Sequence, residues 1–395
     1  MPAATVIPVD RGGGGDTFIE SLIHLPEAVP DLRLDVVALM PLGVPIEAPN
    51  GVRIRYVRSA RLHRWLWKHR EGKNPIASFF LLCLTAYVLS REALRLSRET
   101  RYDLIYAAGG PIAGLAGIRV KRKLRLPLAM HFQFTYHFSA AKPLMRKIVR
   151  AFYEQADALI GNCPMLGKDA VALGVPTRKC HWVFNWIDQD LFRPYEQRGE
   201  HRARFGITDE QTAFFFGGRF DDSKHVDRLI RALTDFHDPR AVFLFAGDGV
   251  LAGELASLAA HDPNIRLLGT VPRHELPSVH AAADVQLWGS VDIDYPGLVV
   301  MEAMSSGLAV FTSEETMNAW YDGAKVDPSI IGAPLFAKLF PPTTEGIHAA
   351  IREAIARRNE LNAIRHDVAA FARRSFGLEN AFKLVEVLRG VCAPP

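Results

Sequence analysis

Short apolar runs alternate with helical stretches along this 395-residue chain, and most of the runs end in a glycine turn. Residues 3–9 form the first run, which leads into Gly12–Gly15 and a helix expected from Thr17. The pattern starts again at residues 213–216, which are followed by Gly217-Gly218. Strand, glycine turn and helix form the repeating unit of doubly wound α/β domains. Because the unit starts twice and the chain is too long for one ordinary core, the sequence predicts two such domains.

The domain boundary is expected in a polar, charged linker, Tyr195–Gly206. The chain then divides into a first domain at residues 1–195, a second domain at residues 196–375 and a terminal helix at residues 376–395. Residues 1–190 carry 26 Lys and Arg against 16 Asp and Glu, although the net charge of the whole chain is only +4. The first domain is therefore basic, and we expect it to face an anionic partner.

One stretch, residues 289–313, combines features of a nucleotide-sugar site. An acidic loop precedes a tight turn, and an apolar helix that carries a second acid follows. The unpaired N–H groups at the start of a helix suit a phosphate, and a carboxylate one turn further can accept hydrogen bonds from a ribose diol. An ordinary loop, helix and strand would show the same pattern. The candidate residues are Ser290, Asp294, Gly297, Leu298, Val299 and Glu302.

The order of residues in this stretch resembles a family signature. Seven residues separate Asp294 from Glu302-Ala303, and Gly297-Leu298 lies between the two acids. This is similar to the signature of the retaining GT-B glycosyltransferases of the group 1 superfamily, which are related to glycogen synthase and sucrose synthase. Asp294 stands where that family usually has Glu, and residues 314–342 match no part of its pattern. The resemblance implies two Rossmann-like domains that face each other across a cleft, with a C-terminal helix that crosses back to the first domain.

A second group of candidates follows the apolar run at residues 213–216. Arg219 and Lys224 place two cations beside the start of a helix, which suits a diphosphate, although two solvated surface charges would give the same pattern. The family resemblance extends to Gly218, to Gly249 of a Gly-Asp-Gly turn and to a hinge-like segment at residues 185–194. It implies that Gly218 and Gly249 contribute to the donor site.

The candidates in the first domain are glycines and a histidine. Gly13, Gly14 and Gly15 would let the backbone approach a ligand closely, although tight turns use glycine in the same way. His131 follows an apolar strand, at the edge where doubly wound sheets bind ligands. His137 competes for this role, and a histidine in an aromatic stretch is often simply packed. The resemblance places the glycines near the donor phosphates and the acceptor, and it favours His131 as a contact to the donor sugar.

The basic segment Arg58–Lys73 contains two tryptophans, and the mostly apolar residues 76–89 follow it. The apolar run is too short to span a bilayer, which needs about 20 residues. Two interpretations stay open: a solvated loop before a buried helix, or a patch in which cations meet an anionic membrane surface and Trp sits at its interface. A second basic cluster, Arg119–Arg125, would add to such a patch. Since no nucleic-acid-binding module accompanies the charge, nucleic acid is not expected as a partner.

The resemblance implies transfer of a sugar from a nucleotide diphosphate sugar, UDP- or GDP-linked, with retention of anomeric configuration. Arg219 and Lys224 would stabilise the leaving diphosphate. Glu302 would hold the ribose, while Asp294 and His131 would contact the donor sugar. Neither a cofactor nor a metal is expected, because these cations and the N–H groups at the start of the helix would neutralise the diphosphate by themselves. The acceptor is expected to be a hydroxyl of a glycan, a glycolipid or a natural product.

Three other functions stay open at this level. They are a non-catalytic sugar-nucleotide-binding subunit, a sugar-nucleotide epimerase of the same fold and a pyridoxal-phosphate-dependent phosphorylase. The replacement of Glu by Asp294 keeps the first of these open. The four cysteines show no metal-ligand spacing, and the start of the sequence lacks a basic n-region, so we expect a cytoplasmic protein. If the basic segment binds a membrane, the protein would be peripheral on its inner face.

Overall fold

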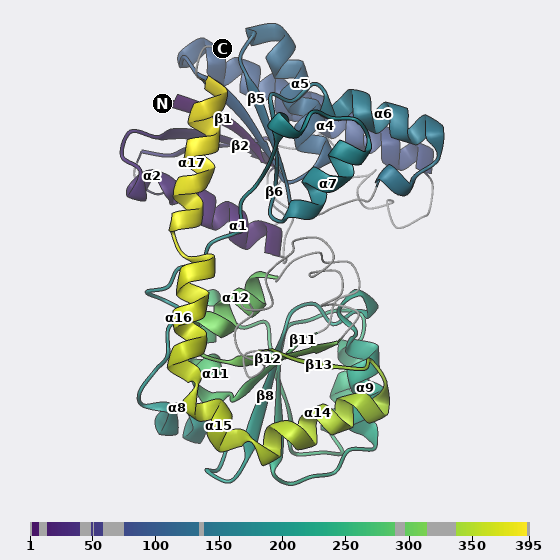
Figure 1. Cartoon of the computed structure of the whole chain (residues 1–395), viewed down its shortest axis with the longest axis vertical. Coiled ribbons are helices and arrows are strands. Elements are labelled where there is room, and N and C mark those ends of the chain that lie inside the picture. The colour runs from purple at the N-terminus through teal and green to yellow at the C-terminus, as the bar shows by residue number, and fades with distance from the viewer. Residues whose placement is uncertain are drawn as a thin grey trace. The chain divides into compact units, whose positions relative to one another are not determined.

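The chain forms two compact units, and each contains one parallel β-sheet (Figure 1). The computed structural model describes residues 2–7, 14–39, 49, 51–57, 75–133, 138–288, 297–313 and 337–392. Unit 1 comprises Met1–Trp186 and Glu379–Pro395, and unit 2 comprises Ile187–Leu378. Within the described residues, all strand pairings are parallel. The predicted α/β class with two parallel sheets is confirmed.

The sheet of unit 1 has seven strands in the order β3-β2-β1-β4-β5-β6-β7. The direction of strand addition reverses next to β1, which is the kind of switch point beside which doubly wound sheets bind ligands. All five residues of β4 and of β5 are buried, because helices cover both faces of the sheet. The strands are β1 Pro2–Ile7, β2 Arg33–Leu39, β3 Arg53–Val57, β4 Leu104–Ala108, β5 Leu128–Phe132, β6 Ala158–Gly161 and β7 Cys180–Trp182.

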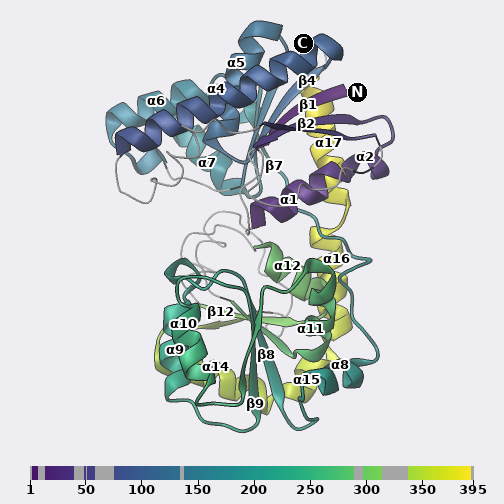
Figure 2. The ribbon, with the colours of Figure 1, turned by 180° about the vertical axis from the view of Figure 1, so that it is seen from behind.

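Helices α4, α5, α6 and α7 share one apolar core with one face of this sheet (Figure 2). The C-terminal helix α17 contacts β4 and β5 on the opposite face. Proline in the first turn of α5, α6 and α7 has the φ that a helix start needs and lacks an N–H that would go unpaired there. In the part of the chain that the structure describes, no helix combines the length and the apolar character needed to cross a bilayer. The helices are α1 Gly14–Ile23, α2 Leu25–Ala28, α4 Pro75–Glu99, α5 Pro111–Leu124, α6 Pro143–Tyr153, α7 Pro164–Ala172 and α17 Glu379–Cys392.

The sheet of unit 2 has six strands in the order β10-β9-β8-β11-β12-β13. Its central strand β8 sends Phe214 and Phe216 into one apolar cluster and Ala213 and Phe215 into another, as the alternation of a strand requires. The last strand, β13, lies in residues 314–342, for which the sequence analysis has no assignment. The strands are β8 Thr212–Gly217, β9 Ala241–Ala246, β10 Ile265–Gly269, β11 Val285–Trp288, β12 Ala309–Ser313 and β13 Ala337–Phe340.

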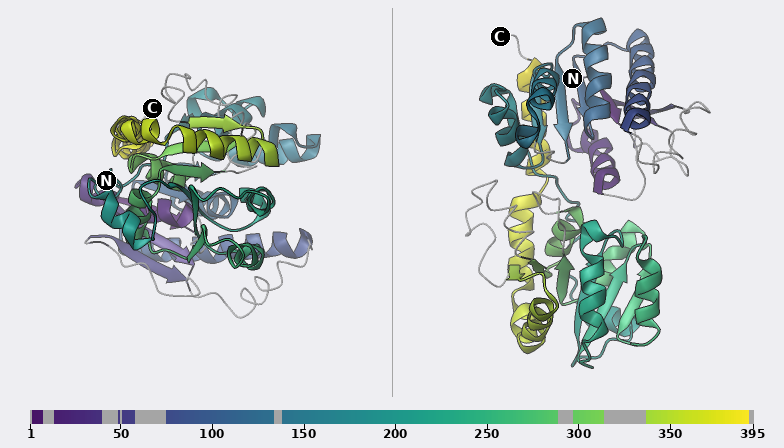
Figure 3. Two further views of the ribbon diagram at one scale, coloured as in Figure 1. Left: turned by 90° about the horizontal axis from the view of Figure 1, so that it is seen from below. Right: turned by 90° about the vertical axis from the view of Figure 1, so that its right-hand side faces the viewer.

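Helices flank this second sheet on both sides (Figure 3). Residues of α9, α10, α14 and α15 belong to the apolar cluster on one face, and residues of α11 and α12 belong to the other. The helices are α8 Arg198–Arg204, α9 Val226–Thr234, α10 Ala252–Ala259, α11 Leu276–Ala282, α12 Leu298–Ser305, α14 Thr344–Ala356, α15 Arg358–Ala363 and α16 Arg365–Phe376.

The two units divide after Trp186, whereas the sequence analysis places the boundary after residue 195. The backbone N–H of Ile187 donates to the carbonyl of Phe376 at 2.9 Å, and the Phe192 side chain is buried. Residues 187–192 therefore pack with α16 as part of unit 2. The segment that returns to unit 1 begins at Glu379, after a break between α16 and α17.

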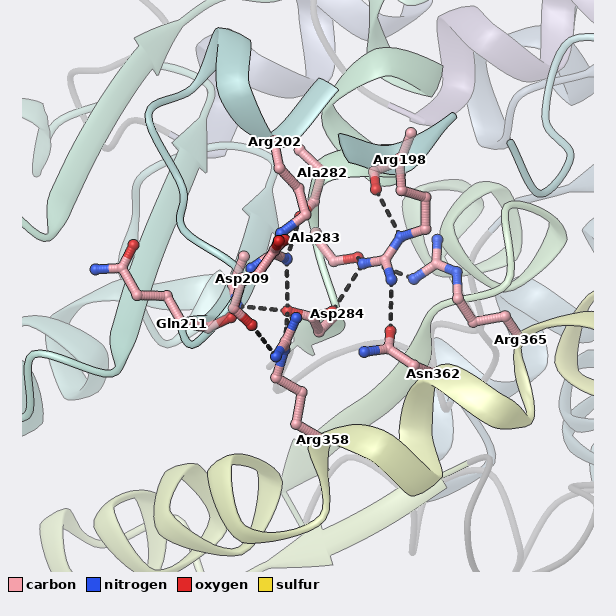
Figure 4. A network of polar contacts seen from close by, with 12 residues as sticks. Arg198, Arg202, Asp209, Gln211, Ala282, Ala283, Asp284, Arg358, Asn362 and Arg365 are labelled. Atoms are coloured by element: carbon pink, nitrogen blue, oxygen red, sulfur yellow. Dashed lines mark hydrogen bonds and ion pairs between the residues drawn. The ribbon is translucent and has the colours of Figure 1, made fainter. Parts of the chain in front are cut away.

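The linker predicted at residues 195–206 is not an open linker, because it contains helix α8 (Figure 4). Arg198 and Arg202 of α8 reach Asp284, which directly precedes β11, at 2.7 Å and 3.0 Å. Burial by itself raises the pKa of the Asp284 carboxyl, but the guanidinium groups of Arg198 and Arg202 bring it below its ordinary value. The charged residues that suggested a linker thus anchor α8 to the sheet.

More guanidinium groups than carboxylates gather in this network, and carbonyl groups at the end of α11 accept the additional hydrogen bonds. Arg198 Nε donates to Ala281 O at 2.9 Å, and Arg365 Nη1 donates to Ala283 O at 2.9 Å (Figure 4). The C-terminus of a helix carries a partial negative charge that favours cations. Since the network lies at the amino end of β11, away from the ligand-binding edge of a parallel sheet, we interpret it as structural.

Candidate functional site

The turns that follow β8 and β9 interlock at the carboxyl edge of the sheet in unit 2. The N–H of Gly218 donates to Ala246 O, and the N–H of Phe220 donates to Asp248 O, both at 2.9 Å. A Cβ atom on Gly247 would lie 1.8 Å from Gly218 O, and one on Gly249 would lie 2.4 Å from Phe220 O. The predicted donor-binding Gly249 therefore has a packing reason to be glycine, since the two backbones could not otherwise approach each other.

The start of α12 packs against the end of β8 at the same edge. A Cβ atom on Gly217 would lie 2.9 Å from Cγ2 of Val299, so the missing side chain makes room for the helix. Gly297 is the N-cap residue, and its carbonyl accepts from the N–H of Val300 at 2.9 Å. Because glycine has no side chain that could cap the helix, the first-turn amides of Leu298 and Val299 are available as donors in the way that anion sites require.

The two predicted cations lie in the connection between β8 and α9. The Arg219 side chain is 62% exposed, and its Nε lies 3.2 Å from Asp221 Oδ2. Lys224 is half-buried in a short 3-10 helix, Asp222–Lys224. Ion pairs at the surface contribute little, about 0–1 kcal/mol, so a phosphate can replace Asp221 as the partner of Arg219 at small cost.

Glu302 lies in the second turn of α12 and is buried, and it already has a cationic partner. Its Oε1 accepts from Arg273 Nε at 3.1 Å. The guanidinium carbon of Arg273 lies 5.1 Å from the centre of the Phe192 ring, which is within the range of a cation–π contact. The sequence analysis did not find Arg273. The one available signal is its position shortly after β10, at the edge to which Arg219 also belongs.

In unit 1, His131 is the fourth residue of β5 and is 1% exposed. Its Nδ1 lies 2.5 Å from Tyr106 Oη, and its Nε2 lies 3.4 Å from Gln133 Nε2. The Phe18 ring meets it edge-on with 5.1 Å between ring centres. Burial lowers the pKa of His131 to about 3, so the ring is neutral near pH 7. A ligand would reach this ring only after the surrounding side chains move.

The structure gathers only part of the predicted site. In unit 2 it brings the Gly218 turn, with Arg219 and Lys224, and the α12 start, with Glu302, to one sheet edge. In unit 1, Gly14 and Gly15 are the first residues of α1, so their amides are helix N-terminal donors. The predictions that fall outside the described residues are Gly13, Arg58–Lys73, His137, Ser290 and Asp294. Among the described side chains, no group of three His, Cys, Asp or Glu residues could hold a metal ion.

Family models match both halves of the chain. Residues 20–186 match the glycosyl transferase 4-like domain, and residues 197–323 match the glycosyl transferases group 1 family. The chain belongs to the group 1 glycosyltransferases. The second match includes the β8–α9 turn, Arg273 and α12. The resemblance to the group 1 glycosyltransferases stated from the sequence is confirmed.

Curated relatives of this glycosyltransferase are 25–29% identical to it over the aligned residues. Sulfoquinovosyl transferase SQD2 of Arabidopsis thaliana is 28% identical over 217 residues, 53% of this chain and 42% of the relative. Alpha-galactosylglucosyldiacylglycerol synthase of Streptococcus pneumoniae is 25% identical over 173 residues, 42% of this chain and 46% of the relative. The matches thus span less than half the length of these two proteins. D-inositol 3-phosphate glycosyltransferase of a Mycobacterium strain is 29% identical over 76% of this chain and 70% of the relative.

Solved structures confirm the GT-B fold of this glycosyltransferase. Anabaena HepE in complex with UDP and glucose matches with a TM-score of 0.70 and 17% identity, covering 98% of this chain and 99% of that one. Sucrose-phosphate synthase from Thermosynechococcus elongatus matches with a TM-score of 0.76 and 17% identity, covering 99% of both chains. At this identity the likeness shows the fold alone.

Proposed function

We propose that this chain is a retaining glycosyltransferase that moves a sugar from a nucleotide diphosphate sugar, UDP- or GDP-linked, to a hydroxyl acceptor. The observation that carries the proposal is that a turn with two cations and the start of a helix, both suited to an anion, meet at one sheet edge. The turn that holds Gly218, Arg219 and Lys224 meets the start of α12 through the contact between Gly217 and Val299. Helix amides and cations of this kind are what a diphosphate requires.

Each predicted residue has a distinct task in this proposal. Arg219, Lys224 and the amides of Leu298 and Val299 neutralise the charge that develops on the leaving diphosphate, so that no metal is required. Glu302, oriented by Arg273, accepts the ribose hydroxyls. Asp294 contacts the donor sugar, and His131 contacts it after the side chains that bury the ring move. Gly13, Ser290 and the start of α1 at Gly14 and Gly15 line the donor site.

The reaction breaks the bond between the anomeric carbon and the diphosphate oxygen and forms a bond from that carbon to the acceptor oxygen on the same face. The acceptor proton passes to the leaving phosphate oxygen, so atoms and charge balance without a protein nucleophile. The enzyme contributes position and electrostatic stabilisation, the two effects that such a transfer needs most.

We further propose a lipid-linked acceptor at an anionic membrane surface. Two relatives from Streptococcus pneumoniae, alpha-galactosylglucosyldiacylglycerol synthase and alpha-monoglucosyldiacylglycerol synthase, are named for diacylglycerol glycolipids. Residues 1–190 carry the basic excess, with Arg58–Lys73 as a membrane-facing segment. The protein would then be cytoplasmic and peripheral on the inner face of the membrane.

The product's anomeric configuration tests the proposal. The enzyme is incubated with UDP-glucose or GDP-mannose and a diacylglycerol or alkyl-glucoside acceptor, with and without EDTA, and the first product is observed by proton NMR. We expect an α-linked product from an α-linked donor at an unchanged rate in EDTA, and a reduced rate in Asp294→Ala. An inverted product would contradict retention, and loss of the reaction in EDTA would contradict metal independence. Epimerised sugar without transfer would indicate the epimerase, and binding without turnover over an acceptor panel would indicate a non-catalytic subunit.

A further inference from the structure

Helix α6 buries only the side that faces the core of unit 1, and its first half is exposed. Residues 142–148 are all exposed, whereas Val149 and Tyr153 join the apolar core. Leu144 is 71% exposed and Ile148 is 55% exposed, and Met145 beside them is 45% exposed. Leu144 and Ile148 are four residues apart and therefore lie on one face of the helix. Single exposed apolar residues are ordinary, but three within five residues form a patch that needs a partner.

Cations flank this apolar patch. Lys142, Arg146 and Lys147 are exposed within the same turns, and α6 contains no acidic residue. One turn later, Arg150 pairs with Glu154 at 2.8 Å, so the cations of the first turns are the ones available to a partner. Large apolar side chains beside Lys and Arg are typical of helices that lie in the interface of an anionic membrane.

The start of α4 shows a second pair of exposed apolar side chains, Phe79 at 62% and Phe80 at 63%. The end of α4 lies at the amino edge of the sheet, where Glu99 pairs with Arg55 of β3 at 3.2 Å. The start of α4 therefore points toward the carboxyl edge, and α6 also begins there because it follows β5. Both helices pack on the same face of the sheet and lie at the margin of unit 1 (Figure 2). The exposed apolar groups thus gather toward the ligand-binding edge.

We propose that the first turns of α6, residues Pro143–Ile148, insert into the headgroup region of an anionic membrane and hold the glycosyltransferase at the surface where its acceptor lies. Leu144 and Ile148 enter the apolar boundary, and Lys142, Arg146 and Lys147 contact anionic headgroups. This proposal rests on the proposed function and deepens it, because it names the element that recognises the lipid surface. A second copy of the chain is a less suitable occupant, since a symmetric contact would bring two basic helices together.

Vesicle flotation of the full chain tests the proposal. The probe is a vesicle of phosphatidylcholine with about a third phosphatidylglycerol, and pure phosphatidylcholine is the comparison. We expect the wild type to float with anionic vesicles and to be released by salt. The double variant Leu144→Asp/Ile148→Asp should bind the anionic vesicles at least about tenfold more weakly, because it removes the inserted apolar side chains. Arg146→Glu/Lys147→Glu should show a similar loss, since each basic residue near the membrane surface contributes appreciably to the free energy of binding.

Matched controls separate α6 from general effects. Phe382→Asp replaces an exposed apolar residue of α17, and Arg373→Glu/Arg374→Glu reverses two adjacent exposed cations of α16. Both should float like the wild type. Circular dichroism and nucleotide binding should be unchanged in the α6 variants, because these side chains are exposed and lie in unit 1.

Two results would overturn the proposal. The first is unchanged flotation of Leu144→Asp/Ile148→Asp. The second is a dimer in sedimentation velocity that this variant disperses, together with no vesicle binding by the wild type. Failure of the proposed function would look different, since the wild type would then bind no nucleotide sugar whatever its affinity for vesicles.

Discussion

The carboxylate of Glu302 is the residue on which nucleotide recognition depends in this account, and Arg273 is its partner. A buried carboxylate without a cationic partner lowers stability, and the pair with Arg273 at 3.1 Å holds the Glu302 side chain in a defined orientation. An ionised carboxylate has about four acceptor positions, so it can bind Arg273 and a ribose diol at once. Phe192, stacked on the guanidinium, helps to hold it in place.

We therefore predict that Arg273→Gln weakens nucleotide binding at least about tenfold, because the buried carboxylate loses its partner. The measurement is isothermal titration with the preferred nucleotide. The matched control is Arg204→Gln, which breaks the exposed pair with Glu275. Equal affinities in the wild type and Arg273→Gln would show that Arg273 does not position Glu302.

His131 gives a prediction about pH. Burial holds its pKa at about 3 in the folded state, below the ordinary value of 6.5, so the unfolded chain binds the proton more readily. Its contribution to stability is present above pH 6.5 and is lost as the pH falls toward 3, with a slope of up to about 1.4 kcal/mol per pH unit. Urea denaturation at several pH values should show that the free energy of unfolding depends less on pH in His131→Gln than in the wild type. In His274→Gln, where the ring is 79% exposed, the slope should match the wild type, and the same slope in both variants would contradict this account.

At the scale of elements, the turns after β8 and β9 interlock at the sheet edge where the nucleotide-sugar site is proposed. Gly247→Ala would push a methyl group to 1.8 Å from Gly218 O, at a φ of +147° that L-residues rarely adopt. We predict a loss of roughly 1–3 kcal/mol in stability and weaker nucleotide binding, because the Gly218 turn must shift. Thermal unfolding and titration calorimetry measure both. Gly253→Ala in α10, where a methyl group meets nothing within 4 Å, is the control and should lose neither property.

The network around Asp284 joins α8 to β11. Because Asp284 must stay ionised to bind Arg198 and Arg202, we also expect stability to fall at low pH. Removing its charge leaves Arg198 and Arg202 without their carboxylate, so Asp284→Asn should cost about 3–5 kcal/mol near pH 7. Because the folded-state pKa lies below 3.8, the contribution is complete above that pH and disappears as the pH falls through the folded value. Asp238→Asn, which breaks a surface pair with Arg240, should cost less than about 1 kcal/mol. If chemical denaturation gave a similar loss of unfolding free energy in both variants, the structural role of the network would be contradicted.

At the scale of the whole molecule, the alternation of apolar runs and glycine turns sufficed to predict two parallel α/β units, because buried parallel strands are continuous apolar runs. The same cues placed Gly218, Arg219, Lys224 and Glu302 near one another, since parallel strands end at a common edge. They failed for α8, whose many charges suggested a solvated linker although Arg198 and Arg202 bind a distant buried carboxylate. They also missed Arg273, because it pairs with Glu302 of α12, which lies 29 residues further along the chain.

The central claim is that unit 2 carries a nucleotide-sugar site in which Glu302 holds the ribose. Titration calorimetry with UDP, GDP, ADP and dTDP tests it most directly, on the wild type, on Glu302→Ala and on the exposed control Glu360→Ala. We expect one nucleotide to bind with one site per chain, with an affinity that falls at least about tenfold in Glu302→Ala and stays unchanged in the control. Binding of no nucleotide to the wild type, or equal affinity in the wild type and Glu302→Ala, would contradict the account.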